Sequence, residues 1–274
     1  MTAYQVIKLN GEKENFSSKK VYQSAMKAGA PAFLAKNIAT EIEKEVYNGI
    51  KTTEIFKKVK DRLKKEDPQI SLRFNLKEGM KKLGPAGFVF EDYVRKVLSR
   101  SGMKVKGNKI LSGKCCSYEI DFLAEKEETT YIGECKYRNN HGDKIDINVC
   151  LKSFAILDDI KSAKHFNADL NFFIVTNSKF TEQAIKYANC KGIKLLGWNY
   201  PKNDGLEILI TKNKLYPITI LPSFRGYCAE IFKKEGIMLV DEILSMDVVK
   251  FSKKVNIPEK QLESLKREAQ ILLK

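Results

Sequence analysis

The stretch EIDFLAEKEETTYIGECKY, residues 119–137, decides the fold of the central part of the chain. Two segments rich in apolar residues flank the charged turn EKEETT, which is typical of an antiparallel β-hairpin. A turn centred between Glu127 and Glu128 pairs Asp121 with Glu134 and places Glu119 opposite Lys136. Period-two alternation puts Glu134 and Lys136 on one face, with the intervening residue pointing the other way.

Two directly opposed carboxylates repel each other unless a cation lies between them. Carboxylate oxygens are the ligands that Mg²⁺ prefers, and Mg²⁺ (or Mn²⁺) usually keeps several waters. Asp121 and Glu134 are therefore candidate metal ligands and catalytic residues. A metal-bound water is a nucleophile suited to a phosphodiester, and Lys136 is placed to orient it or to stabilise the charged transition state.

Secondary-structure signals continue on both sides of this hairpin. A helix of period 3.6 precedes it and further strands alternate with helices after it, which predicts a mixed α/β sheet covered on both faces. Residues 206–221 add one or two edge strands to this prediction. The expected helices are 86–101, 147–166 and 180–191, and the expected strands are 103–106, 109–112, 118–124, 131–137, 170–176 and 193–198.

The acidic-x-Lys triplet by itself is weak evidence in a chain so rich in lysine. Asp159-Ile160-Lys161 is a second instance, and it falls in a helical stretch. The alternative interpretation of the hairpin is an ordinary exposed cluster of cross-strand charges. Other candidates for phosphate contact just past the hairpin are Arg138, His141 and Lys144, although His141-Gly142 also resembles a plain turn. We interpret His165 and the Cys115-Cys116 pair as structural.

The central residues resemble a known family of nucleases. Asp121…Glu134-Cys135-Lys136 resembles the D…(D/E)-x-K motif of the restriction-endonuclease-like superfamily. GFVFEDYVRKVLSRSGMKV (87–105) resembles the first helix of Mrr-type enzymes, and FFIVTNSKFTEQAIKYANCKGIKLLGW (172–198) resembles their later strand–helix–strand. The resemblance covers about residues 86–200 and implies an αβββαβ core, Mg²⁺-dependent DNA hydrolysis and Glu91 as a further carboxylate at the metal site. The commonest Mrr form has Gln where Glu134 stands.

Residues 1–84 predict a β-hairpin followed by about four helices, the first capped by Ser17 or Ser18 and the last over about 71–82. VIKLNGEKENFSSKKV (6–21), GIKTTEI (49–55) and RFNLKEGMKKLGP (73–85) resemble the ATP-cone, a nucleotide-binding regulatory module. The resemblance implies ATP or dATP as an effector, although Leu9 replaces a basic residue that is usual in the family. The alternative is a basic helical DNA-binding domain, and no Walker motif is present. By resemblance, the nucleotide-contacting positions are Val6, Lys8, Glu14, Lys20 and Thr52.

The remaining residues, 222–274, carry helical patterns throughout. Gly236-Ile237 and the apolar residues that follow resemble a helix-hairpin-helix-like or SAM-like piece, which implies binding either to DNA backbone or to a protein. We therefore predict a multidomain α/β chain of three parts. These are a nucleotide-binding ATP-cone domain over 1–84, a restriction-endonuclease-like domain over 85–221 and a small all-α domain over 222–274.

Composition agrees with a polyanionic partner. The formal net charge is +15, with a sequence pI near 9.4, and Lys and Arg neutralise the phosphates of nucleic acid. The six cysteines include no C-x-x-C pair, which argues against a zinc ribbon and favours reduced thiols in the cytoplasm. No apolar run reaches the length needed to span a bilayer, so we expect no membrane partner.

Taken together, these patterns favour a Mg²⁺-dependent DNA endonuclease of restriction or defence type, regulated by ATP or dATP. One alternative is a catalytically silent, nucleotide-responsive DNA-binding regulator. Another is a repair nuclease or an RNA nuclease on the same fold, because the motif reports phosphodiester chemistry and not the polymer. A double-strand cut in one event needs two active sites, which favours a homodimer.

Overall fold

The computed structural model describes residues 4–84, 90–140, 142–164 and 169–274. By its internal contacts the chain divides into two compact units. One contains Met1–Lys81, Pro217–Ile231 and Val240–Lys274, and the other contains Lys82–Tyr216 and Phe232–Leu239.

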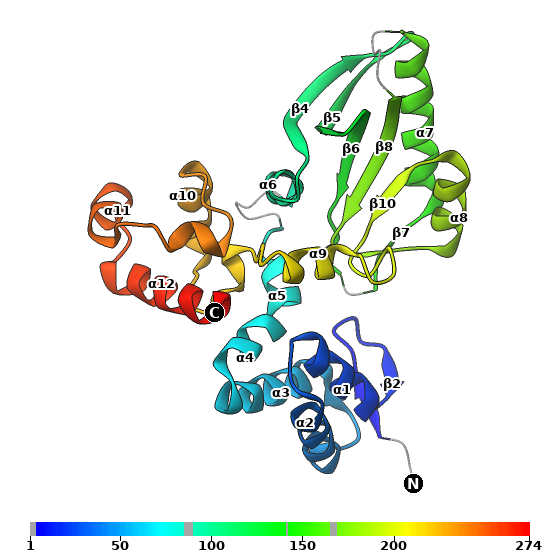
Figure 1. The fold of residues 1–274 in the computed structure, drawn as a ribbon. Coiled ribbons are helices and arrows are strands. Elements are labelled where there is room, and N and C mark those ends of the chain that lie inside the picture. Colours follow the sequence, from blue (N-terminus) through cyan, green and yellow to red (C-terminus); the bar gives the residue numbers. More distant parts are fainter. Residues whose placement is uncertain (1–3, 85–89, 141, 165–168) are drawn as a thin grey trace. The chain divides into compact units, whose positions relative to one another are not determined.

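The second unit is built on a five-stranded mixed sheet (Figure 1). The strand order is β10-β8-β6-β5-β4, in which β4, β5 and β6 are antiparallel neighbours and β6, β8 and β10 are parallel. The strands of this sheet are β4 (Lys104–Ser112), β5 (Ser117–Lys126), β6 (Thr129–Lys136), β8 (Asp169–Thr176) and β10 (Lys194–Leu196). A short parallel pair lies apart from it, formed by β7 (Lys144–Ile145) and β9 (Lys179–Phe180).

Helices cover both faces of this sheet, as the sequence predicts (Figure 1). Helix α6 (Phe90–Arg100) lies on one face, and α7 (Ile147–Ser162) and α8 (Glu182–Lys191) lie on the other. Helix α9 (Leu206–Lys212) follows the last strand. The order α6-β4-β5-β6-α7-β8 confirms the expected αβββαβ core.

Local sequence explains where these helices begin and end. The side chain of Asp146 accepts a hydrogen bond from the N–H of Asn148 and so caps α7. Thr181 caps α8 in the same way, and Gly192 ends that helix in the left-handed conformation that glycine adopts without strain. Strand β8 is buried along most of its length, which accounts for its near-continuous apolar run.

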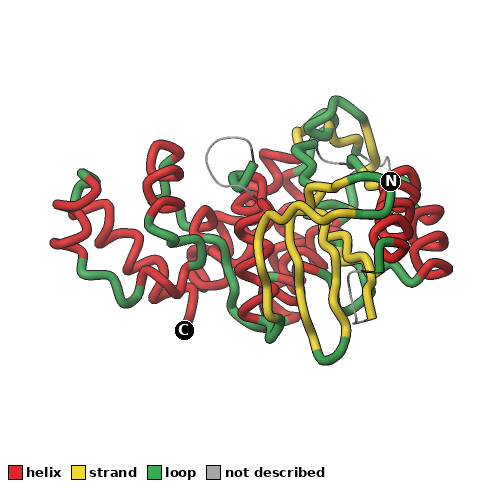
Figure 2. Tube along the Cα trace, turned by 90° about the horizontal axis from the view of Figure 1, so that it is seen from above, coloured by secondary structure: helices red, strands yellow, loops and turns green. Residues whose placement is uncertain are grey.

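The hairpin register agrees with the prediction from the EKEETT turn. Observed partners include Phe122 with Gly133 and Ala124 with Tyr131, which is the register set by a turn between Glu127 and Glu128. The adjacent strands are visible side by side in Figure 2. The hydrogen-bonded ladder ends at Phe122 and Gly133, so the expected pairings of Asp121 with Glu134 and of Glu119 with Lys136 are not part of it.

The first unit contains the N-terminal hairpin and most of the remaining helices. Strand β1 (Gln5–Ile7) pairs antiparallel with β2 (Lys13–Asn15) and parallel with β3 (Ile50–Lys51). Ser17 caps α1 through the N–H of Lys20, as expected from the sequence. Its helices are α1 (Ser18–Lys27), α2 (Ala32–Glu45), α3 (Thr52–Glu66), α4 (Pro68–Phe74), α5 (Leu76–Lys81), α11 (Val248–Val255) and α12 (Glu259–Leu273).

The C-terminal helices of this unit pack on its N-terminal part. Helix α12 lies against α4, and Gln69 Nε2 donates to the carbonyl oxygen of Leu272 at 3.2 Å. The amide of Asn75, between α4 and α5, donates to the carbonyl oxygen of Ile220 at 3.1 Å. Helix α10 (Ala229–Lys234) crosses the boundary between the units, and the 3-10 turns are η1 (Ile218–Ile220), η2 (Gly226–Cys228) and η3 (Val240–Ile243).

Three local expectations were wrong. Residues 206–221 form α9 and η1 and no edge strand, because Leu206 and Ile210 are buried at helical spacing. The helix expected over 71–82 is two short helices separated at Asn75. The strands expected at 103–106 and 109–112 are one continuous strand, β4. None of the described helices is both long and apolar enough to cross a membrane.

Candidate functional site

Asp121 on β5 and Glu134 on β6 meet where the hairpin ladder ends. Beyond the last ladder pair, the side chain of Asp121 bonds the neighbouring strand directly. Its Oδ2 accepts a hydrogen bond from the backbone N–H of Cys135 at 2.6 Å. Cys135 itself is buried, and Glu134 and Lys136 lie on the opposite side of β6 from it. The hairpin therefore holds Asp121 next to the segment that carries Glu134 and Lys136.

Glu91 lies in the first turn of α6, and the charges of the hairpin carboxylates affect its pKa. Its pKa is raised above the usual range by burial and by the negative charge of Asp121. The pKa of Asp121 is raised by burial and by Glu134, although the N–H of Cys135 and the charge of Lys136 act to lower it. The negative charges of Asp121 and Glu134 both act on Glu91, and that of Glu134 acts on Asp121.

Lys136 is engaged with one of these carboxylates. Its ammonium contacts Oε1 of Glu134 as an ion pair, with 31% of the Lys136 side chain and 17% of the Glu134 side chain exposed. A partly exposed pair of this kind is accessible to an incoming phosphate. A lysine ammonium is compact and its stem is flexible, which suits Lys136 to the role of a mobile point charge.

The carboxylates fit a divalent cation by their chemistry. Glu91 and Asp121 carry oxygen ligands, and no ion pair joins either of them to a cation among the described residues. Burial is the main cause of their raised pKa values and neighbouring carboxylates add to it, so a hard cation would favour the ionised form of both. Across the described parts of the chain, no three His, Cys, Asp or Glu side chains are already gathered as a metal-binding group.

Three residues that support this site were not singled out from the sequence. Arg95, one turn after Glu91 on α6, donates to the backbone oxygen of Asp121 at 3.0 Å. Thr176 on β8 donates through Oγ1 to the backbone oxygen of Lys136 at 2.5 Å. Asn177 exchanges hydrogen bonds with the backbone of Arg138 at 2.8 and 2.9 Å. The i, i+4 spacing of Glu91 and Arg95 was the one signal available in the sequence.

The remaining candidates near the hairpin have different positions. The Arg138 guanidinium donates to the backbone oxygen of Tyr137, and its own backbone is fixed by Asn177. Lys144 begins the short strand β7 and is exposed. His141 and His165 lie outside the residues that the structure describes.

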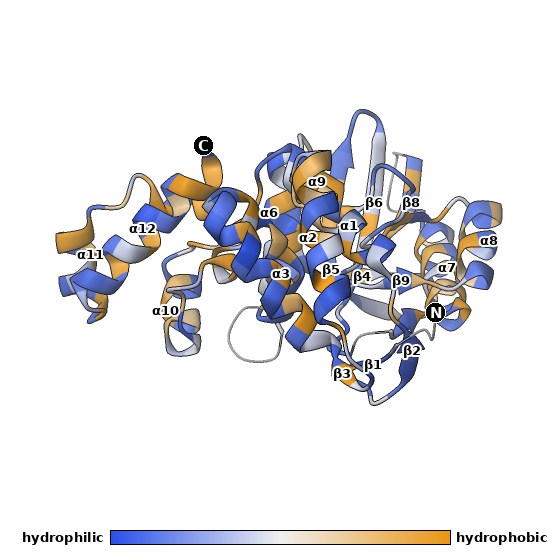
Figure 3. Cartoon of the chain, turned by 90° about the horizontal axis from the view of Figure 1, so that it is seen from below, coloured by the Kyte–Doolittle hydropathy of each residue, from blue (hydrophilic) through white to orange (hydrophobic). Residues whose placement is uncertain are grey.

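In the N-terminal unit, three of the predicted nucleotide-contacting residues form one charged cluster. Oε2 of Glu14 lies 3.2 Å from Nζ of Lys8 and 3.0 Å from Nζ of Lys20. The two lysines come from different elements, since Lys8 directly follows β1 and Lys20 lies in α1. Strand β2, which carries Glu14, is hydrophilic (Figure 3).

The other two predicted contacts lie beside this cluster in the fold. Val6 pairs with Glu14 across the hairpin and with Ile50 on the other side, and its side chain is buried in the core of the unit. Thr52 begins α3 directly after β3, and it is part of the helix and not its cap. The small sheet therefore connects the segments that carry all five residues.

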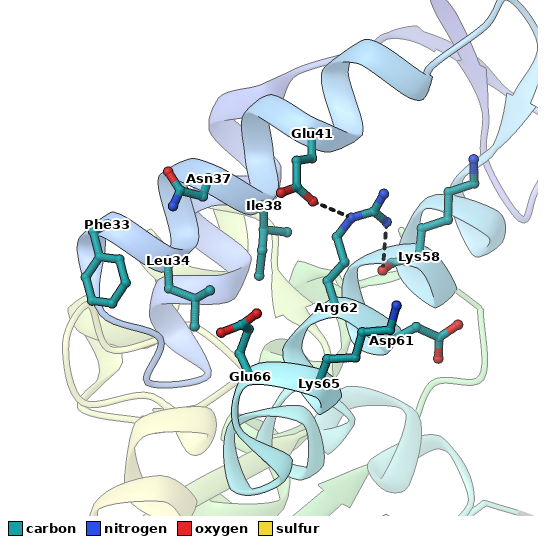
Figure 4. A pocket seen from close by; sticks show the side chains of 10 residues that line it. All are labelled: Phe33, Leu34, Asn37, Ile38, Glu41, Lys58, Asp61, Arg62, Lys65 and Glu66. Atoms are coloured by element: carbon teal, nitrogen blue, oxygen red, sulfur yellow. Dashed lines mark hydrogen bonds and ion pairs between the residues drawn. The ribbon is translucent and has the colours of Figure 1, made fainter.

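A pocket of about 460 Å³ lies elsewhere in this unit, between α2 and α3 (Figure 4). Phe33 stands at its edge, and Arg62 lies within it. Two cations of the pocket are already paired, because Arg62 Nε donates to Glu41 at 2.8 Å and Lys58 pairs with Glu45 at 3.0 Å. None of the five predicted nucleotide-contacting residues lines this pocket.

Three protein families match successive parts of the chain. Residues 4–74 match the ATP cone domain, residues 85–199 match a restriction endonuclease family, and residues 216–273 match the AF1548-like C-terminal domain. These matches confirm the predicted succession of an ATP-cone, a restriction-endonuclease-like domain and a helical C-terminal part.

Two comparisons concern longer stretches of the chain. An uncharacterized protein from Archaeoglobus fulgidus is 36% identical over 154 residues, which are 55% of this chain and 83% of that protein. The crystal structure of a protein of unknown function, AF1548, has a TM-score of 0.57 and 32% identity, and covers 66% of this chain and 94% of that one. The chain belongs to the AF1548-like family.

Membership of the AF1548-like family gives this chain relatives but no established activity. The two relatives are described as uncharacterized or of unknown function. The boundaries at residues 84 and 221 and the roles of the individual site residues stay predictions.

Proposed function

We propose that this chain is a Mg²⁺-dependent DNA endonuclease whose activity responds to ATP or dATP at the N-terminal cone. The observation that carries the proposal is the hydrogen bond from Cys135 N–H to Asp121, which holds this carboxylate beside the segment that carries Glu134 and Lys136 on a restriction-endonuclease-like domain. Neighbouring carboxylates repel one another, and burial further disfavours the ionised forms of Glu91 and Asp121. Their arrangement is favourable once a divalent cation and a phosphate share the site.

Each residue has a defined part in this proposal. Asp121 and Glu134 would hold the metal, Glu91 would be a further carboxylate at the same site, and bound Mg²⁺ or Mn²⁺ would supply an activated water and charge neutralisation. Asp121 is held in place by the N–H of Cys135. Lys136 moves from Glu134 to the phosphate or the attacking water, where its positive charge opposes the negative charge of the transition state.

DNA as the substrate is supported by exposed lysines on the strand next to Asp121. Lys104, Lys106 and Lys109 are exposed on β4, the outer strand that pairs with β5. Exposed lysines in a row neutralise successive phosphates of a nucleic-acid backbone. The chain's formal net charge of +15 agrees with this class of partner. A role in restriction or defence and assembly as a homodimer belong to the same proposal.

Plasmid cleavage tests the nuclease directly. We expect Mg²⁺-dependent or Mn²⁺-dependent cutting that Lys136→Ala abolishes and EDTA prevents. Lys161→Ala is the matched control, because Lys161 ends the second acidic-x-Lys triplet and lies exposed on α7. Equal cutting by the wild type and Lys136→Ala would contradict the assignment. Modified and unmodified DNA and RNA serve as parallel substrates.

One observation favours a second candidate, the catalytically silent DNA-binding regulator. The Lys136 ammonium contacts Glu134, so a proposed metal ligand is already neutralised by the chain itself. On that hypothesis no substrate is cut with any divalent cation. DNA binding that changes with ATP or dATP, in the absence of cutting, is the result that distinguishes the regulator from the nuclease.

Substitutions in the charged cluster of Lys8, Glu14 and Lys20 test nucleotide binding by the ATP-cone. We expect Lys8→Ala to weaken ATP and dATP binding by about tenfold, the effect of losing one charge-assisted contact to a phosphate. Lys36→Ala is the control, since Lys36 is exposed on α2 away from the cluster. Calorimetric titration measures both. Unchanged affinity in Lys8→Ala would place any bound nucleotide elsewhere.

A further inference from the structure

A second cavity lies within the restriction-endonuclease-like unit, apart from the carboxylates. Its volume is about 320 Å³, within the range of roughly 300–1,000 Å³ that is typical of small-molecule sites. Its walls come from the end of α6, from β8 and from the segment after β10. The apolar lining includes Leu98, Met103, Phe173, Tyr200 and Leu209.

The wall after β10 is fixed by its own backbone. Gly197 N–H donates to the carbonyl oxygen of Tyr200 at 2.8 Å, and Leu206 N–H donates to the carbonyl oxygen of Gly197 at 2.9 Å. A side chain at Gly205 would place its Cβ 2.7 Å from the carbonyl oxygen of Trp198, so this turn closes only with glycine. A wall held in this way does not have to be ordered when a ligand binds.

Two lysines, Lys126 and Lys194, give the cavity positive charge. The ammonium of Lys194 lies 4.8 Å from the ring centres of both Tyr131 and Phe173. Burial and the charge of Lys126 lower the pKa of Lys194, and Asp204 opposes them only in part. Within the described residues no ion pair neutralises Lys126 or Lys194. A bound anion would relieve the repulsion between these two ammonium groups.

The remaining polar side chains of the cavity can form hydrogen bonds with the edge of a planar ring. Ser101, Asn189 and Asp204 also line the cavity and provide both donors and acceptors of hydrogen bonds. A ligand that matches the whole lining has an apolar planar body, a hydrogen-bonding edge and a negative charge at one end. A nucleotide has all three features.

The cavity is within reach of a strand bound at the carboxylates. Leu98 lies two helical turns beyond Glu91 on α6, about 10 Å along the axis. Lys126 lies five residues beyond Asp121 on β5, about 16 Å along the strand. At about 3.4 Å per nucleotide, these separations correspond to roughly three to five steps along a DNA strand.

We propose that this cavity binds one nucleotide, with its base among the apolar walls and its phosphate at Lys126 and Lys194. This assignment rests on the proposed function in one respect only, which is that a nuclease binds DNA as a source of the nucleotide. The occupant is either a base that has left the stack of bound DNA or a free mononucleotide. Enzymes that unstack a base hold it in a pocket of this kind, through stacking and contacts to its edge.

The test measures binding in EDTA, so that loss of cleavage has no effect on it. The full chain carries Lys8→Ala and Lys20→Ala in every sample to remove the cone's charged cluster. One probe is deoxyadenosine 5′-monophosphate, followed by calorimetry. The other is a short duplex with a single 2-aminopurine, whose fluorescence rises when the base leaves the stack.

Two changes alter the cavity and one serves as its control. The double variant Lys126→Gln, Lys194→Gln removes both charges, and Asn189→Trp fills the cavity from an exposed position. Lys191→Gln is the matched control, because the ammonium of Lys191 also lies over a ring, 4.7 Å from the centre of Phe154, but does not line the cavity. Thermal unfolding checks that each variant folds.

We expect both cavity variants to weaken binding at least about tenfold, as for loss of a charge-assisted contact, while Lys191→Gln has no effect. A fluorescence rise that Asn189→Trp abolishes identifies a base of the strand as the occupant. Mononucleotide binding without that rise identifies a free nucleotide. If neither probe responds, or if the cavity variants behave like Lys191→Gln, the proposal is overturned.

Discussion

The carboxylate of Asp121 on β5 accepts a hydrogen bond from the backbone N–H of Cys135 on β6, with 2.6 Å between the two atoms. The hydrogen-bonded ladder between β5 and β6 ends at the pair Phe122 and Gly133. The bond between Cys135 and Asp121 connects the two strands just beyond that pair. One oxygen of Asp121 is thereby tied to the neighbouring strand. Among the described residues, none makes a hydrogen bond to the other oxygen.

Two substitutions at Asp121 separate this structural bond from the chemistry. Asp121→Asn keeps an oxygen that accepts from Cys135, so we expect near-normal stability with cleavage reduced by about 100-fold or more, the range for removing one electrostatic group from a catalytic site. Asp121→Ala removes both functions. Its loss of the buried acceptor costs about 1–3 kcal/mol in the free energy of unfolding.

Cleavage assays and urea unfolding of the two variants measure the two effects independently. Equal stability of Asp121→Asn and Asp121→Ala would show that the bond to Cys135 does not hold the site together. Full activity in Asp121→Asn would remove Asp121 from the metal site.

Glu91 is expected to destabilise the protein when no metal is present. Burial and the charge of Asp121 raise its pKa, so its ionised form is unfavourable at neutral pH. We expect Glu91→Gln to raise Tm in EDTA by about 2 °C, since roughly 1 kcal/mol corresponds to 2–4 °C in a chain of this size. Mg²⁺ or Mn²⁺ should raise Tm of the wild type and have less effect on the variant.

Differential scanning calorimetry with and without the metal tests this coupling. Asp92→Asn is the control, because Asp92 is the next residue but pairs with Arg95 and lies 3.9 Å from Lys233. A Tm that responds to Mg²⁺ equally in the wild type and Glu91→Gln would exclude Glu91 as a ligand.

Thr176 positions Lys136 from the adjacent strand. Its hydroxyl donates to the backbone oxygen of Lys136 at 2.5 Å and accepts from the N–H of Ser178 at 3.1 Å. Thr176→Val keeps the volume but leaves both backbone groups without this partner, which costs about 1–3 kcal/mol for each group that stays buried. We expect lower Tm together with weaker cleavage.

The matched control is Thr211→Val, in which the hydroxyl bonds only within its own helix, to the backbone oxygen of Glu207 at 2.9 Å. Cleavage rates at saturating DNA separate an effect on the catalytic step from weaker binding. If Thr176→Val loses stability but cuts at the normal rate, the hydroxyl supports the fold and does not position Lys136.

The hairpin register was predictable because it depends on local sequence. A charged turn between two alternating segments fixes which residues are partners, and one slip would expose the buried face. The end of the ladder was not predictable. It coincides with Gly133, where a Cβ would lie 2.2 Å from the ring of Phe122, and such a contact depends on packing across strands.

The helix at 206–212 shows a different limit of the sequence. The segment LEILITK has residues favoured in strands, but its two buried positions, Leu206 and Ile210, are one helical turn apart. Burial by the surrounding structure decided between the two patterns. The packing of α12 on α4 could not be predicted from the sequence either, because it joins residues about two hundred positions apart.

Asp159 on α7 gives a prediction of pH dependence away from the site. Its carboxylate accepts from the backbone N–H of Cys115 at 3.0 Å and from the hydroxyl of Tyr118 at 2.9 Å. Burial acts to raise the pKa of Asp159, but hydrogen bonds from Cys115, Tyr118 and Cys116 lower it overall. The same contact raises the pKa of Tyr118 to about 12.

A carboxylate with a lowered pKa in the folded protein stabilises it above the unfolded pKa and loses that effect as pH falls through the folded pKa. We therefore expect Asp159→Asn to be less stable than the wild type at pH 7, and the difference to shrink below about pH 4. Asp158→Asn, at the exposed neighbouring position, should show no such trend. Urea unfolding across this pH range measures it, and a difference that stays constant would mean that hydrogen-bond geometry, not charge, holds the turn at residues 113–116.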